Sequence, residues 1–152
     1  MSTQPSAVPG ADRAPSLTIR RRINATAAKV YAAWTQPAQL MRWMQPLDNT
    51  CTHAEADVRV GGRFRVIMRG PGGEEHDVSG TYLEVVPEQK LVFTWAWRST
   101  PERESLVTVT LHADGCETDL TLKHERFFDE AARDSHNEGW TSAIDQFVAL
   151  FE

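Results

Sequence analysis

The last part of the chain has the clearest hydrophobic pattern. Large apolar side chains recur there every three or four positions, and no Gly or Pro follows Gly139. This spacing predicts one amphipathic helix from His136 to Glu152. Its apolar residues are Trp140, Ala143, Ile144, Phe147, Val148, Leu150 and Phe151. Such a helix needs an apolar surface elsewhere in the chain to cover its stripe.

That surface is predicted by the long middle region, where apolar and polar residues alternate with the period of β-strands. Turn residues, mostly Gly, Pro and Asp, divide the region into hairpins. The expected strands, with one before the middle region, are 17–23, 52–58, 62–69, 75–86, 90–98, 105–113 and 117–127. In segment 75–86 apolar residues fall on both faces of the predicted strand, so we expect a β-bulge near Gly80.

Two short helices are expected after the first strand. Thr26 is a typical helix cap before an apolar-patterned segment that ends at Trp34. Proline is tolerated in the first turn of a helix, so a second helix is expected from Pro37 to Trp43. The whole order predicts an α+β fold in which a curved antiparallel sheet of six to seven strands wraps around the long C-terminal helix. A small ligand would lie between that sheet and that helix.

Composition limits the number of domains and the classes of partner. With 41% hydrophobic residues, a single domain from 17 to 152 is expected. Residues 1–16 hold three prolines and no apolar periodicity, which predicts a disordered tail that is neither a signal nor an anchor. Residues 23–152 carry 12 basic and 20 acidic side chains, which disfavours nucleic acid. We expect no membrane span, a cytoplasmic location and two reduced cysteines.

Strand phase and helix spacing select the side chains that could line the space under the helix. Five Trp residues provide more aromatic surface than a tight small core readily fills, which favours an aromatic-lined cavity. The candidate ligand-binding residues are Phe64, Met68, Tyr82, Trp95, Trp97, His124, Trp140 and Ile144. The alternative is that all of them are core. For His124, a hydrogen-bonded core histidine is the more frequent case, and a ligand-orienting or acid–base role the rarer one.

Few residues indicate catalysis or a cofactor. His53, Glu55 and Asp57 have the spacing of metal ligands along one strand face, but a solvated strand face gives the same pattern. The segment 70–73 is Gly-rich but no helix follows it, so it is a turn rather than a phosphate loop. No Ser or Cys lies in a nucleophile elbow. We therefore expect no catalytic residue, no metal and no cofactor.

Four segments, taken in order, resemble the activator of heat shock protein 90 ATPase homologue 1-like family of the START-like, SRPBCC superfamily. They are Asp57–Phe64, Gly80–Pro87, Leu91–Trp95 and the pair Gly139-Trp140. The resemblance runs from about Ile19 to the C-terminus. It implies a helix-grip fold with a hydrophobic pocket and no universal catalytic set.

The expected function is binding of a hydrophobic small molecule, aromatic or lipid-like and neutral or weakly polar. Two alternatives remain, because one fold hosts many functions. A polyketide cyclase or aromatase would use His124 and Tyr82 as proton-transfer groups. A co-chaperone-type regulator of a heat-shock ATPase would have a chaperone as its partner. An enzyme is the less expected outcome, and the sequence indicates no oligomeric state.

Overall fold

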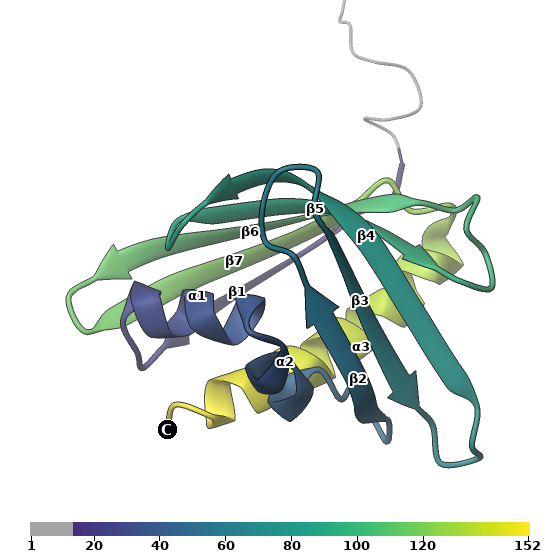
Figure 1. Cartoon of the computed structure of the whole chain (residues 1–152), viewed down its shortest axis with the longest axis horizontal. Coiled ribbons are helices and arrows are strands. Elements are labelled where there is room, and N and C mark those ends of the chain that lie inside the picture. Colours follow the sequence, from purple (N-terminus) through teal and green to yellow (C-terminus); the bar gives the residue numbers. More distant parts are fainter. Residues whose placement is uncertain (1–13) are drawn as a thin grey trace, which may run out of the picture.

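The computed structural model describes residues 14–152, which form a seven-stranded antiparallel sheet and three helices (Figure 1). The strands are β1 (Leu17–Ile23), β2 (Thr50–Ala56), β3 (Arg63–Arg69), β4 (Glu75–Val86), β5 (Lys90–Trp97), β6 (Ser105–Asp114) and β7 (Glu117–Glu125). The helices are α1 (Ala27–Thr35), α2 (Pro37–Trp43) and α3 (Glu130–Ala149). The sheet order is β1-β7-β6-β5-β4-β3-β2.

The sheet curls over α3, and α1 and α2 lie beside the C-terminal part of that helix (Figure 1). The inward phase of each central strand is apolar and buried, and it meets the apolar stripe of α3. At the far end Trp34 of α1 and Trp43 of α2 pack on Phe147, with ring centroids 5.8 and 4.9 Å away. This is the helix-grip arrangement that the alternation and the final helix predicted.

The long helix begins six residues before the predicted start at His136. Asp129 caps it, because its carboxylate accepts a hydrogen bond from the Ala132 N–H at 2.8 Å. The first turns, Glu130–Ser135, carry no large apolar side chain, so the hydrophobic period is invisible there. Gly139 consequently lies in the middle of the helix. A Cβ at this position would meet only the Pro46 Cβ, at 3.8 Å.

The irregularity of β4 lies slightly beyond the position predicted for it. The pairing of β4 with β5 shifts between Tyr82 and Glu84, so Leu83 is the extra residue and is exposed. Gly80 has another role. A Cβ there would lie 1.8 Å from the Thr94 carbonyl oxygen and 2.7 Å from a Phe64 ring carbon, so the strands approach too closely for any side chain.

The N-terminal segment expected as a tail falls mostly outside the described residues, which begin at residue 14. Two residues at its end contact the domain: the Pro15 carbonyl accepts from the Phe127 N–H, and the Ser16 carbonyl accepts from Arg133. Both cysteines are free thiols, Cys51 buried and Cys116 exposed. No helix within residues 14–152 is long and apolar enough to cross a membrane.

Candidate functional site

A cavity of about 610 Å³ opens between the sheet and the N-terminal half of α3. Strands β3, β4 and β5 form one wall, α3 forms the opposite wall, and the loop between α2 and β2 closes one side. The lining residues are Met44, Pro46, Leu47, Asn49, Met68, Glu75, His76, Asp77, Trp95, Trp97, Arg98, Ser99, Ser135, His136, Gly139, Trp140 and Ala143. The volume lies within the range of small-molecule sites.

The α2–β2 loop is held against α3 by two hydrogen bonds. The Leu47 N–H donates to Ser142 Oγ at 2.8 Å, and the Gln146 side-chain amide donates to the Gln45 carbonyl at 2.7 Å. Leu47 itself has a positive φ of 56° and is 60% exposed. An apolar side chain is thereby held at the edge of the cavity, where a bound ligand would cover it.

Three indoles are part of the apolar lining of the cavity. The ring centroids of Trp95 and Trp140 are 5.1 Å apart, and those of Trp95 and Trp97 are 5.7 Å apart. Trp95 and Trp140 are almost completely buried, whereas Trp97 is partly exposed. Within residues 14–152 the Trp95 indole N–H is buried without an acceptor. At these separations the rings pack on one another, so the three indoles form one continuous aromatic surface.

His136 joins the two walls of the cavity. The Trp97 indole N–H of β5 donates to His136 Nε2 at 2.9 Å, and His136 Nδ1 lies 2.7 Å from the Ala132 carbonyl. An indole nitrogen can only donate, so Nε2 is the acceptor and Nδ1 carries the proton. Burial lowers the pKa of His136. The imidazole is therefore neutral, and its tautomer is set by its partners.

His124 forms a second bridge, inside the core. Its Nδ1 accepts from the Trp140 indole N–H at 2.9 Å, and its Nε2 lies 2.6 Å from Ser105 Oγ. Ser105 Oγ in turn donates to the Trp95 carbonyl at 3.3 Å. Burial lowers the pKa of His124 well below its ordinary value. With both ring nitrogens engaged, this histidine is neutral and connects β7, β6 and α3.

The structure separates the eight sequence-predicted site residues into two groups. Met68, Trp95, Trp97 and Trp140 line the cavity. The other four lie in the core beside it and are not among the lining residues: Phe64, Tyr82, His124 and Ile144. Phe64 packs on Tyr82 and Trp95, at 5.8 and 6.1 Å between ring centroids, and so supports the aromatic wall from behind.

Several lining residues were not among the predicted ones. On α3 they are Ser135, His136, Gly139 and Ala143, and of these His136 and Ala143 lie four and three residues from Trp140. That signal was present in the sequence. The loop residue Leu47 lies outside regular elements, where periodicity carries no information, and Arg98, expected as the last residue of strand 90–98, follows β5 in the structure.

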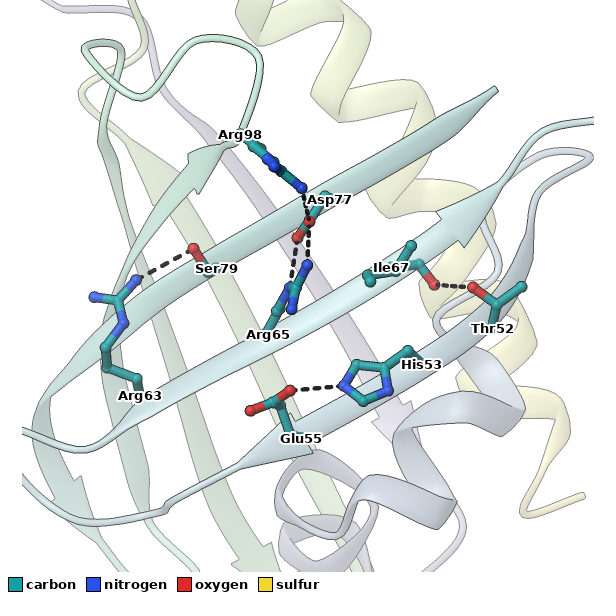
Figure 2. Close-up of polar contacts among 9 residues, drawn as sticks. All are labelled: Thr52, His53, Glu55, Arg63, Arg65, Ile67, Asp77, Ser79 and Arg98. Atoms are coloured by element: carbon teal, nitrogen blue, oxygen red, sulfur yellow. Dashed lines mark hydrogen bonds and ion pairs between the residues drawn. The ribbon is translucent and has the colours of Figure 1, made fainter. Parts of the chain in front are cut away.

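Ion pairs lie on the outer face of the sheet, where Asp77 of β4 meets Arg65 of β3 and Arg98 (Figure 2). The Arg65 guanidinium contacts both oxygens of the Asp77 carboxylate, at 3.1 and 2.7 Å, and lowers the pKa of that carboxyl group. Glu75 lies 3.8 Å from Arg69. Arg98 reaches Asp77 Oδ2 only at 3.8 Å, and its side chain is 81% exposed.

The three residues with metal-ligand spacing do not form one cluster. His53 Nε2 pairs with Glu55 at 2.6 Å on the outer face of β2 (Figure 2), whereas Asp57 follows the strand and pairs with Arg59 at 2.9 Å. Within residues 14–152 no group of three or more His, Cys, Asp or Glu residues has the geometry to hold a metal ion.

Known proteins resemble this chain in sequence. Residues 24–152 match the family model described as "Activator of Hsp90 ATPase homolog 1-like protein". A segment of 94 residues is 31% identical to the human protein named "Activator of 90 kDa heat shock protein ATPase homolog 1". That match covers 59% of this chain and 26% of the human protein, so the chain spans about a quarter of that relative's length.

Solved structures resemble it in fold over nearly the whole chain. A crystal structure of a Chromobacterium violaceum protein is 28% identical, with a TM-score of 0.82 and coverage of 90% of this chain and 96% of that one. The AHSA1 protein from Silicibacter pomeroyi is 27% identical, with a TM-score of 0.77 and coverage of 89% and 96%. CalU16 from Micromonospora echinospora is 28% identical, with a TM-score of 0.68 and coverage of 91% and 76%.

Proposed function

The chain belongs to the activator of Hsp90 ATPase homolog 1-like family, and within this family we propose that it binds a hydrophobic, aromatic small molecule between β5 and α3. The observation that carries the proposal is the cavity of about 610 Å³ with three indoles in its wall. A ligand there would bury its own apolar surface and stack on Trp95 or Trp140. In this proposal Met68, Trp97 and Trp140 contact the ligand directly.

Binding alone accounts for the residues at this site better than catalysis does. The cyclase-type alternative needs His124 and Tyr82 as proton-transfer groups, and neither lines the cavity. Both nitrogens of His124 are engaged, and burial raises the pKa of the Tyr82 phenol. His136 reaches the cavity, but its two nitrogens are engaged as well. A general acid or base needs a nitrogen or oxygen that faces the substrate.

The test uses N-phenyl-1-naphthylamine, a neutral probe whose fluorescence rises in apolar surroundings. We expect a saturable increase in probe emission and a parallel change in Trp emission, because the probe would contact the indoles. Gly139→Leu should raise the dissociation constant at least about tenfold, since the new side chain extends into the cavity. Gly139→Ala is the matched control, and its smaller side chain should change the constant less than about threefold.

Both variants should fold, because a non-glycine residue is favoured inside a helix and the added Cβ meets only Pro46. Thermal unfolding followed by circular dichroism checks this. A folded wild-type protein without a saturable response to the probe would refute the proposal. Equal affinity of Gly139→Leu and wild-type would place the probe elsewhere.

A second candidate function is contact with a heat-shock chaperone, which the human relative favours through its name and its 31% identity. The matched segment is about a quarter of the human protein, so any ATPase activation belongs to this chain only as a proposal. The measurement is the ATPase rate of a purified 90 kDa heat-shock protein with and without this chain. An unchanged rate together with no complex in size-exclusion chromatography would remove this candidate.

A further inference from the structure

The loop between α2 and β2 holds one leucine in an unfavourable state. Leu47 has a backbone φ of 56°, in the left-handed region, and the residue is 60% exposed. A bulky side chain is disfavoured at such a φ, and an exposed leucine leaves apolar surface in water. Glycine or asparagine would suit this backbone better. The fold alone therefore gives no reason for a leucine at this position.

Strain and exposed apolar surface coincide at the cavity. Within residues 14–152 the non-glycine residues with positive φ are Leu47, Glu88 and Arg126, and the other two are charged and lie outside the cavity lining. Large exposed apolar side chains elsewhere on the described surface, such as Leu83 and Phe128, have negative φ and do not line the cavity. Leu47 combines both features and lines the cavity, which indicates a role at this site.

Hydrogen bonds fix the loop from two sides. On the helix side, the Leu47 N–H donates to Ser142 Oγ and the Gln146 amide donates to the Gln45 carbonyl. On the sheet side, the Cys51 N–H of β2 donates to the Gln45 side-chain oxygen at 3.1 Å. Leu47 is thus held at the cavity before a ligand arrives, and such preorganisation lowers the entropy that binding must overcome.

The cavity passes from buried to exposed between the indoles and Leu47. Trp95 and Trp140 are each 4% exposed, whereas Leu47 is 60% exposed. A ligand that fills only the space beside the indoles would leave Leu47 in water. A longer ligand would cover the leucine, and the apolar surface removed from water would strengthen binding.

We propose that Leu47 is a ligand-contacting residue and that the ligand has two apolar parts, an aromatic one among the indoles and a second one against Leu47. This deepens the proposed binding function and rests on it. The leucine makes the free protein less stable and the complex tighter, which is the exchange between stability and function found at many binding sites.

The experiment compares N-phenyl-1-naphthylamine, which has two ring systems, with 1-naphthylamine, which has one. Both are uncharged at neutral pH, and Trp emission follows their binding. Leu47→Asn should weaken binding of the larger compound about three- to tenfold and that of the smaller one less than about twofold, because only the larger one reaches the leucine. Leu47→Met keeps an apolar side chain and should keep both affinities within about twofold.

The stability of the same variant gives a second readout. Asparagine tolerates a positive φ, so Leu47→Asn should melt at the wild-type temperature or up to about 3 °C above it. Leu83→Asn is the matched control, because it makes the same substitution at an exposed leucine outside the cavity lining. It should leave both affinities unchanged.

Three results would overturn the inference while probe binding kept the proposed function. They are an unchanged affinity of Leu47→Asn for the larger compound, an equal loss for both compounds, and a lower melting temperature of this variant, which would give Leu47 a structural role. A wild-type protein that does not bind N-phenyl-1-naphthylamine would refute both the inference and the proposed function.

Discussion

At the scale of single residues, hydrogen-bond partners decide the protonation state of the two inner histidines. Each accepts an indole N–H, from Trp97 at His136 and from Trp140 at His124. A proton added to the accepting nitrogen would face that donor and break the bond. Burial adds the cost of a charge in an apolar surrounding. The native state therefore holds both imidazoles neutral, while the unfolded chain binds protons at its ordinary histidine pKa.

This difference predicts how stability changes with pH. A pKa lowered in the folded state means that the unfolded state binds more protons once the pH falls below about 6.5. The free energy of unfolding should therefore be constant above pH 7.5 and fall by about 1–2 kcal/mol between pH 7 and 5.5, as urea unfolding at several pH values can measure.

His136→Gln separates the contributions, because glutamine offers Trp97 an acceptor but does not titrate. The pH dependence should then be about half as steep, whereas His112→Gln, at an exposed position, should leave it unchanged. An unaltered slope in His136→Gln would show that this histidine is not held neutral.

A second residue-scale prediction concerns Gly80. Gly80→Ala should cost more than about 2 kcal/mol or prevent folding, because the new methyl group would overlap the Thr94 carbonyl of the paired strand. Gly72→Ala is the control, since its Cβ would meet only the flexible end of Glu74. Denaturant midpoints give the comparison. Equal stability of the two variants would contradict the close approach of β4 and β5.

At the scale of elements, the two halves of α3 are stabilised in different ways. Its C-terminal half carries the buried residues Trp140, Ile144 and Phe147, which hold the helix on the sheet. Its first turns carry no large apolar residue and begin at the cap Asp129. The cavity lies against this N-terminal half, so the cap helps to hold His136 where it meets Trp97.

Asp129→Ala should lower the stability by about 1 kcal/mol, the usual cost of a lost side-chain cap. The corresponding fall in melting temperature is about 3 °C for a domain of this size. Glu138→Ala, exposed in the middle of the same helix, is the control and should change it little. Circular dichroism melts measure both. A loss as large in Glu138→Ala would mean that the cap contributes nothing specific.

At the scale of the whole molecule, one helix completes a core that the sheet cannot close alone. The curled sheet presents its apolar inner face to α3, and α1 and α2 close only one end of the curl (Figure 1). Without α3 the inner face of the sheet would be exposed over most of its length. The helix is thus a wall of the cavity and also a condition for the fold.

A chain that ends at Asp129 should not fold cooperatively. It loses the burial of Trp140, Ile144 and Phe147, which are each at most 4% exposed. At about 1.5–3 kcal/mol for each large side chain, the loss approaches the whole stability of a typical domain. A chain that ends at Phe151 is the control and should keep its melting curve. A cooperative melt of the shorter chain would contradict the central role of α3.

The sequence alone determined the elements and their order. The alternation of apolar and polar residues predicted both ends of β1 and of β4 at the residues where the structure has them. Thr26 and Pro37 marked the starts of α1 and α2. The apolar stripe of the final helix required a sheet to cover it. These features are local, because propensity, capping and periodicity act within one segment. The alternation along β5 likewise predicted that Trp95 and Trp97 lie on the face of the sheet that carries the cavity.

Only the tertiary structure decided which inward residues reach a ligand. Phe64 and Trp95 share the inward phase, yet one supports the wall from behind and the other lines the cavity, because depth under a curved sheet depends on strands far apart in the chain. Partners distant in sequence also decided the protonation of His124 and the weak pairing of Arg98. Hydrogen bonds and ion pairs join residues that meet only when the chain folds, and no periodicity along the sequence records them.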